Sequence, residues 1–441
     1  MIQLLKPLPS VEYDCPACRC SLIVQTWAIP GMWCVAGLRC PECGEEFYGA
    51  LREGHGLFAP ALIRSSDGSI VMDGGTTWKE FLARELKAGY QRRNSADLTV
   101  NVRRSRPVQG KPLIVNCLDY CYGHSLPKLF SLEYYLDRCP EYSLIVIIPR
   151  ALEWMVPEGV AEIWRVDAGW SKLGGWYDDL DARFKELMAR WPEVWLASAP
   201  AVVHSLNIDI RRFTGVQPFD VGKLSLAPGP KLTFIWRDDR YPGRASGPIG
   251  DRLHSGLRRL FPGAWLRFSR YRHRRFIEKV ARALRKKLPD VDFAVVGMGK
   301  PGGFSAGIRD LRSDRLDAET ERAWCRRYAE SQLVAGLHGS NMMLPTAHAG
   351  AALTLYSSGY TMLVPFSDTI LNHPQAGHPT MSALLRYRSI PAHTGARTVA
   401  EWMYAIVASF SPLLEVWQSH GDEAGEVVSP RDSLVTPKAK A

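Results

Sequence analysis

The chain has 441 residues, a length typical of about three domains. It is 46% hydrophobic and 23% charged, which excludes a mainly disordered or fibrous protein. Its 55 Lys and Arg residues outnumber 45 Asp and Glu residues, and the net charge of +10 favours anionic partners. Such partners are nucleic acid, phosphorylated small molecules or an anionic membrane surface.

Two C-x2-C pairs, separated by 21 residues, mark the segment 1–50: Cys15, Cys18, Cys40 and Cys43. Four thiolates at this spacing complete a tetrahedral shell around Zn²⁺, so we expect a small zinc ribbon with a structural ion. Cys20 and Cys34 lie in the same segment and remain alternative ligands. The ribbon by itself leaves open whether it grips nucleic acid, grips protein or only stabilises the N-terminal segment.

Polar, basic residues fill 51–110, which we expect to be an irregular linker with one helix near 77–90. From 111 to 225, apolar runs alternate with amphipathic stretches, a pattern typical of βαβ units and a parallel sheet. The strands expected there are 112–118, 144–148, 161–166 and 194–197.

The same alternation restarts after a Pro/Gly linker at 226–230 and continues over 231–418. The strands expected in this half are 231–236, 291–296, 333–337 and 352–356. The fold class is therefore α/β, with two Rossmann-like domains preceded by the zinc ribbon. The tail 419–441 has little apolar content and is expected to be disordered.

A turn in the second half combines features of an anion site. The apolar strand LVAGL ends in His338-Gly339-Ser340-Asn341, and a helix is expected over 340–349. Gly339 permits a close backbone approach, and Ser340 or Asn341 can cap the helix whose N–H groups would face a diphosphate. A plain strand–helix turn with a capping serine is the alternative.

The helix–strand–HGSNMMLP–helix–strand pattern resembles the donor half of GT-B-fold glycosyltransferases. It is most similar to family-61-type glycosyltransferases, which carry a VHGAGLTN turn, and more loosely to heptosyltransferases. The resemblance spans roughly 111–415 and implies a nucleotide-sugar held between two Rossmann-like domains, acceptor domain first and donor domain second. It implies that His338, Gly339, Ser340 and Asn341 face the donor phosphates. Ser-Asn stands where the family has Ala-Gly, so the sugar stays open.

Two arginines follow the first strand of the expected donor domain, Arg237 and Arg240. In enzymes with this resemblance, an arginine at that place often meets the diphosphate, and a permanently charged, bidentate guanidinium suits the role. A surface Arg–Asp pair is the alternative interpretation of the same residues.

Asp119 and His124 follow the first strand of the N-terminal half, where the carboxyl ends of the strands would face the donor. Either side chain can accept the proton of an acceptor hydroxyl as a general base. The alternative is structural: Asp119 caps a turn and His124 bonds the backbone.

The stretch 252–287 contains thirteen Lys or Arg residues and one acid, with aromatic residues interleaved. Such a stretch can neutralise phosphates or hold an anionic leaflet, although a solvated helix packed on the sheet also explains it. The leading interpretation is a glycosyltransferase that uses a nucleotide-sugar donor and an unknown hydroxyl acceptor. The alternative is a non-catalytic nucleic-acid-binding protein that uses the ribbon and this stretch.

The N-terminus lacks a secretory signal pattern, and no apolar run has the length and continuity of a membrane span. We therefore expect a cytoplasmic protein, with peripheral binding at the inner membrane face left open by its basic charge.

Overall fold

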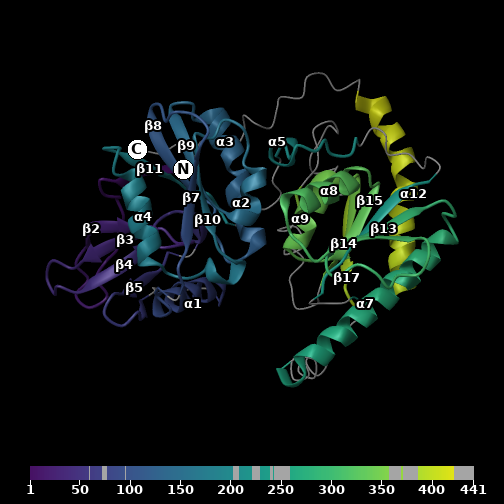
Figure 1. Cartoon of the computed structure of the whole chain (residues 1–441), viewed down its shortest axis with the longest axis horizontal. Helices are drawn as coiled ribbons and strands as arrows, with labels where there is room; N and C mark the ends of the chain where they lie inside the picture. The colour runs from purple at the N-terminus through teal and green to yellow at the C-terminus, as the bar shows by residue number, and fades with distance from the viewer. Residues whose placement is uncertain are drawn as a thin grey trace.

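The computed structural model describes residues 1–58, 60–71, 77–94, 96–201, 208–220, 229–238, 242, 259–356, 369–370 and 386–421, with side chains left out at 77–82 and 410–421. The described chain is mixed α/β, with two six-stranded sheets and a smaller five-stranded sheet (Figure 1). Parts of the expected linker at 226–230 and most of the expected tail at 419–441 lie outside the described residues.

The N-terminal six-stranded sheet has the order β1-β11-β8-β9-β10-β7. Its four central strands are parallel and its two edge strands are antiparallel. The strands are β1 (Ile2–Lys6), β7 (Thr99–Arg104), β8 (Lys111–Asn116), β9 (Tyr142–Pro149), β10 (Glu162–Asp167) and β11 (Val194–Ala197). The four strands expected over 111–225 are confirmed as the parallel centre, because runs such as LIVII bury both faces of a sheet.

Helices cover both faces of this sheet. On one face α2 and α3 share a buried cluster with β8 and β9, and on the other α4 packs beside the five-stranded sheet. The helical elements are α2 (Tyr122–Phe130), α3 (Leu132–Arg138), η2 (Arg150–Met155), η3 (Trp170–Lys172) and α4 (Asp178–Met188).

The C-terminal six-stranded sheet is parallel throughout, with the order β14-β13-β12-β15-β16-β17. Counted along the chain, this order is third, second, first, fourth, fifth, sixth. The strands are β12 (Lys231–Ile235), β13 (Asp292–Met298), β14 (Ile308–Ser313), β15 (Leu333–Leu337), β16 (Ala351–Tyr356) and β17 (Tyr387–Pro391). The two edge strands, β14 and β17, were not expected from the sequence, because neither has a continuous apolar run.

In the C-terminal half, α7 and α12 cover one face of the sheet, while α8 and α9 cover the other (Figure 1). The helical elements are α5 (Arg211–Thr214), α7 (Pro262–Arg285), α8 (Ala318–Ala329), η5 (Ser340–Met342), α9 (Met343–His348) and α12 (Ala396–Gly421). The face with α8 and α9 shares one buried cluster with α2 and α3, so the two halves join through these helices.

The cysteine pairs lie in turns next to the strands of the five-stranded antiparallel sheet, which extends beyond residue 50. Its elements are β2 (Ile23–Ala28), β3 (Val35–Arg39), β4 (Glu46–Ala50), η1 (Gly54–Leu57), β5 (Leu62–Arg64) and β6 (Ile70–Val71), followed by α1 (Thr77–Gln91). We call residues 13–71 the Cys-rich module.

The expected boundaries in this region need correction. The interval 51–110 is not an irregular linker, because it contains β5, β6, α1 and the edge strand β7. The first residues do not belong to a ribbon either, since β1 pairs with β11 across about 190 residues of chain. Strand pairing at this sequence distance leaves no periodic signal near either strand.

Candidate active site

Two residues expected to bind the donor lie side by side at the centre of the C-terminal sheet. Arg237 follows β12 and His338 follows β15, and these neighbouring strands mark the point where the strand order reverses. The Arg237 Nη1 group donates to the His338 carbonyl oxygen and to Asn341 Oδ1, both at 2.9 Å. In open α/β sheets, ligands bind outside the carboxyl ends of the strands at this reversal point.

Gly339 has a backbone that suits glycine, with a φ of +143°. A Cβ at this position would overlap the Arg237 guanidinium. The group that approaches the Gly339 backbone closely is therefore the Arg237 guanidinium of this chain.

The expected caps differ from the structure. Ser340 begins the short η5 turn and α9 has six residues, and neither Ser340 nor Asn341 makes a side-chain cap. Instead, Asn341 accepts from Arg237 and donates from Nδ2 to the Leu337 carbonyl at 3.3 Å. An anion at this turn would depend on Arg237 more than on a helix dipole. Arg240 lies outside the described residues.

Asp119 and His124 lie together at the carboxyl edge of the N-terminal sheet. Asp119 Oδ1 accepts from the Cys121 backbone N–H at 3.0 Å and lies 3.3 Å from His124 Nδ1. Asp119 therefore accepts a hydrogen bond at the start of α2, as a capping residue would, and also faces the His124 imidazole, as a residue of a catalytic site would. Asp119 is fully buried, whereas about 29% of the His124 side chain is exposed.

Three residues of this cluster were not anticipated from the sequence: Glu53, His55 and Lys128. His55 Nε2 lies 2.8 Å from Asp119 Oδ2. Lys128 Nζ donates to the Leu118 carbonyl at 2.9 Å, and lies 3.5 Å from Glu53 Oε1 and 3.9 Å from Asp119 Oδ2. Glu53 and His55 lie within the expected linker, where no local pattern indicated a site.

Burial and charge set the ionisation of this cluster. Burial alone would raise the pKa of Asp119, but His55, His124 and Lys128 together hold that pKa well below its usual range. Burial also opposes the charge of Lys128, yet Glu53 and Asp119 raise its pKa. Burial lowers the pKa of His55 and raises that of Glu53 to about 7. Asp119 is thus a carboxylate whose neighbours must donate hydrogen bonds.

The atoms of His55, Asp119 and His124 are close enough to hold a metal ion. Two features favour a hydrogen-bonded cluster instead. The 2.8 Å separation of His55 and Asp119 is that of a direct hydrogen bond, and the Lys128 ammonium already supplies a buried positive charge beside the carboxylate.

The two candidate sites meet where the halves join. A Cβ at Gly123 would overlap the Ser340 side chain. The first turn of α2, which includes Gly123 and His124, therefore contacts the turn after β15. Beside this contact, Glu321 of α8 accepts from the Tyr122 hydroxyl at 2.7 Å and from Trp154 Nε1 at 2.9 Å. Burial raises the pKa of Glu321 to about 7.

The four cysteines of the two C-x2-C pairs form one cluster, with all four sulfur atoms within 4.8 Å of one another. Sγ separations of 3.6 Å for Cys15–Cys43 and 3.4 Å for Cys18–Cys40 approach the ~3.8 Å edge of a tetrahedron with 2.3 Å Zn–S bonds. The Cys43 backbone N–H lowers the pKa of the Cys40 thiol to about 6. Backbone hydrogen bonds also act on Cys18 and Cys43, but the neighbouring thiols outweigh them and raise the pKa of both groups, so Cys40 ionises before these two.

The alternative cysteines are outside this cluster. Cys34 is buried beside Asn116 Nδ2, at 3.5 Å, against the end of β8. Cys20 lies next to the cluster, where its side chain interacts with the Cys18 thiol, but its sulfur is not among the four that lie within 4.8 Å of one another. The cluster can therefore hold a metal ion with Cys15, Cys18, Cys40 and Cys43 as ligands, and these thiols suit zinc.

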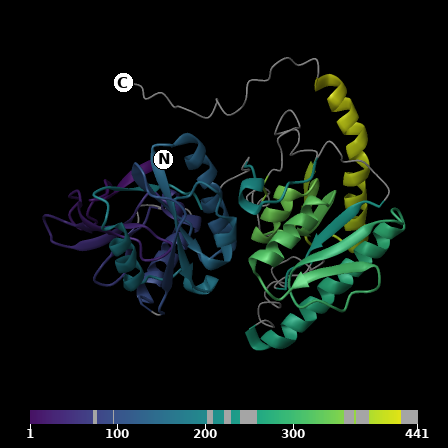
Figure 2. The ribbon, with the colours of Figure 1, turned by 45° about the horizontal axis from the view of Figure 1, so that its top comes forward.

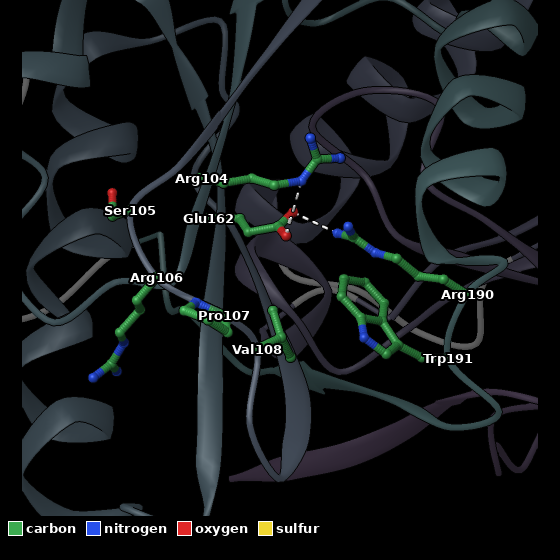
Figure 3. Close-up of a pocket in the computed structure, with 8 residues that line it drawn as sticks. All are labelled: Arg104, Ser105, Arg106, Pro107, Val108, Glu162, Arg190 and Trp191. Atoms are coloured by element: carbon green, nitrogen blue, oxygen red, sulfur yellow. Dashed lines mark hydrogen bonds and ion pairs between the residues drawn. The ribbon is translucent and has the colours of Figure 1, made fainter.

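A hollow of about 500 Å³ lies at the opposite, amino edge of the N-terminal sheet (Figure 3). Glu162, the first residue of β10, pairs there with Arg104 at 3.4 Å and with Arg190 at 2.5 Å. Figure 3 shows both guanidinium groups turned toward Glu162 while Arg106 points away. This hollow contains none of the expected site residues.

The part of the basic stretch over 259–287 forms α7 and its flanks, whereas 252–258 lies outside the described residues. Its C-terminal part packs on the sheet through Ile277, Val280 and Leu284. Its N-terminal part exposes apolar side chains, including Phe261 at 60% and Tyr271 at 51%. Figures 1 and 2 place this helix and the Cys-rich module on opposite sides of the molecule.

A scan of the chain against models of known protein families gives no match, and a search of curated protein sequences gives none either. Within the described part of the chain, every helix is too short or too polar to cross a membrane.

Proposed function

We propose that this chain is a glycosyltransferase that moves a sugar from a nucleoside-diphosphate donor to a hydroxyl acceptor. Its two large sheets would be the Rossmann-like domains of a GT-B fold. The order of the C-terminal sheet supports this architecture, because it matches the 3-2-1-4-5-6 order of dinucleotide-binding sheets. The observation that carries the proposal is the contact of Gly123 with Ser340. It joins the first turn of α2, which carries His124, to the turn 338–341, to which Arg237 bonds.

His124 is the proposed base. For an inverting transfer, its Nε2 would accept the proton of the acceptor hydroxyl while the acceptor oxygen bonds to the sugar carbon. Asp119 is too deeply buried to reach a substrate, so it positions His124 by accepting from Nδ1. The arrangement follows the logic of a serine-protease triad, in which a buried carboxylate fixes the imidazole tautomer.

Arg237 is the proposed diphosphate ligand. When the sugar leaves, the bonding electron pair goes with the diphosphate, whose growing negative charge a guanidinium can stabilise. His338, Gly339, Ser340 and Asn341 would shape the turn around it. The Cys-rich module would hold a structural zinc ion.

A thermal-shift screen tests the donor site, using UDP, GDP, ADP, CMP and dTDP with their sugars. A nucleotide that binds only the folded chain stabilises it by about 3 kcal/mol at a hundred-fold excess over Kd. We expect one base to give a clear shift and Arg237→Ala to lose it. Arg326→Ala, on the exposed side of α8, is the matched control and keeps the shift. A full shift in Arg237→Ala would remove Arg237 from the site.

Transfer itself is measured as release of the nucleotide that the screen selects. We expect His124→Ala to lower turnover by about 10²–10⁴-fold with little effect on the thermal shift, because a base acts on the acceptor rather than on the nucleotide. Unchanged turnover in His124→Ala would exclude it as the base.

The exposed basic and aromatic end of α7 favours one further candidate, a nucleic-acid-binding protein. Arginines with interleaved aromatic rings can neutralise phosphates and stack on bases. Retention on single-stranded DNA or RNA that weakens steeply with salt would support this candidate, and loss of retention in Arg267→Ala with Arg270→Ala would localise it to α7. No retention at low salt would end it, and retention on anionic vesicles alone would point to a membrane surface.

A further inference from the structure

Two side chains of the Cys-rich module, those of Glu53 and His55, contact the buried residues next to the candidate base. Glu53 and His55 follow β4 by three and five residues, and about 2% of Glu53 and 1% of His55 is exposed. They lie against Asp119 and Lys128, which come from a separate part of the chain and are fully buried. Polar groups buried to this degree are costly unless they have partners. His55 Nε2 meets Asp119 and Glu53 Oε1 lies 3.5 Å from Lys128 Nζ, whereas His55 Nδ1 makes no hydrogen bond within the described part of the chain.

The backbone of η1 fits into the N-terminal sheet at its own reversal point, between β8 and β11. The Gly54 N–H donates to the Ser198 carbonyl, directly after β11, at 2.7 Å. Gly54 has a φ of +53°, and a Cβ there would lie 2.8 Å from Lys128 Nζ. Between β4 and β5 the module therefore contributes a turn at Gly54, whose left-handed backbone favours glycine and which lies against the buried lysine.

We propose that the Cys-rich module supplies a residue of the candidate active site, His55, which positions the His124 base through Asp119. His55 donates from Nε2 to Asp119 Oδ2, which leaves Oδ1 to accept from His124 Nδ1. This inference rests on the proposed function, which assigns the base to His124.

The hydrogen-bond chemistry requires this direction. Asp119 is ionised and can only accept, so both imidazoles must present an N–H to it. His124 then carries its lone pair on Nε2, the tautomer that a base needs. Burial lowers the pKa of His55, which favours its neutral form, so His55 orients the carboxylate without adding a second positive charge beside that of Lys128.

Lys128 explains why a second donor is needed. Its ammonium lies 3.9 Å from Asp119 Oδ2, on the same side as His55. Without the His55 N–H, the Cys121 N–H would still hold Oδ1, but Oδ2 would move toward Lys128 and the carboxylate would lose its alignment with His124. A neutral amide donor at position 55 would preserve the alignment, whereas an apolar ring would not.

The test is nitrogen-15 NMR of the histidine rings in the full-length, zinc-loaded chain, with His124→Gln used to assign the His124 signals. In the wild type we expect the Nε2–H tautomer for His55 and the Nδ1–H tautomer for His124. His55→Gln keeps the His124 tautomer, and His55→Phe converts it to a mixture of both forms. The opposite tautomer of His55 in the wild type overturns the proposal without any variant, even if His55→Phe does not fold.

Turnover separates this inference from the proposed function. If transfer is found, His55→Phe should lower turnover by about 10–100-fold, part of what a base contributes, and His55→Gln should restore most of it. Wild-type turnover and tautomer in folded His55→Phe would refute the positioning role while His124 stays the base. Expected tautomers without transfer on any donor would instead overturn the proposed function alone.

Discussion

The two candidate sites occupy equivalent places in the two large sheets but are built differently. In the N-terminal sheet, Asp119 and Lys128 are fully buried and bound to Glu53 and His55, which come from a distant segment. In the C-terminal sheet, Arg237 is half-buried and bonds to the turn of the neighbouring strand. The first site depends on buried charges, and the second on the shape of a turn.

This difference predicts different responses to substitution. Removal of one member of a buried, charged network leaves the others uncompensated, so the N-terminal site should lose stability when it loses function. Among the described residues, the C-terminal site consists of the Arg237 cation against the glycine-containing turn 338–341, so substitutions there should lower ligand binding more than stability.

Loss of the metal should have the largest effect. Binding of a structural zinc ion contributes on the order of 10 kcal/mol in small zinc domains, so a chelator should unfold the Cys-rich module and withdraw His55 from Asp119. Cys15→Ser with Cys40→Ser should act in the same way, whereas Cys20→Ser, which is not one of the four grouped thiols, keeps the metal. Metal analysis and tryptophan fluorescence measure the outcome.

The nucleotide shift should survive in the metal-free chain, because the buried cluster around the Cys-rich module includes no residue of the C-terminal sheet. Loss of that shift together with the metal would show that the two sites are not independent, and full zinc content in the double cysteine variant would exclude these ligands.

Lys128→Met should have the next largest effect. It leaves Glu53 and Asp119 buried beside each other without a cation, and breaking a buried pair in this way costs about 3–5 kcal/mol. Lys185→Met is the matched control, because its pair with Asp181 is about 39% exposed on the lysine side and such pairs contribute about 1 kcal/mol or less. Chemical denaturation compares the two, and equal losses would contradict the buried network.

The sequence predicted the C-terminal site better than the N-terminal one for a physical reason. Arg237 and His338 each follow a strand that the sequence predicts, and parallel strands place their carboxyl ends at one edge, so the prediction already puts both residues at the same edge of the sheet. Their pairing follows from the observed strand order. The cysteine knuckles are also local, each closed within a few residues. His55 joins Asp119 only through tertiary packing, and a histidine between two glycines was the one available signal. The capping role expected of Ser340 failed because Arg237 holds Asn341 and Gly339 starts the turn.

Glu321→Gln tests the joint between the halves and should have a smaller effect. Burial raises the pKa of Glu321 from its ordinary 4.5 to about 7, so its contribution to stability is full below pH 4.5 and is lost as pH rises through 7. The shift corresponds to roughly 3 kcal/mol across this window at 1.36 kcal/mol per pKa unit.

Thermal unfolding at pH 4.5, 6 and 7.5 measures this loss. The glutamine keeps an acceptor for Tyr122 or Trp154 but cannot ionise, so the variant should show a flatter dependence on pH. The pKa of Glu53 is also raised to about 7, so Glu53 should account for the pH dependence of stability that remains in this variant. The double variant Glu53→Gln with Glu321→Gln should lose the contribution of both groups. Identical pH profiles for Glu321→Gln and the wild type would remove Glu321 from the titration.

Gly339→Ala should have the smallest effect on stability and a large one on ligand binding. The added Cβ at a φ of +143° costs on the order of 1–3 kcal/mol and pushes against the Arg237 guanidinium, which must leave the His338 carbonyl. We expect nucleotide affinity to fall at least about ten-fold, because Arg237 no longer faces the diphosphate. Gly263→Ala in α7 is the control, since no described residue lies within 4 Å of a Cβ built there and helix propensity favours alanine. If Gly339→Ala binds nucleotide like the wild type, the shape of this turn does not determine binding. The statement that the C-terminal site depends on the shape of a turn would then be wrong.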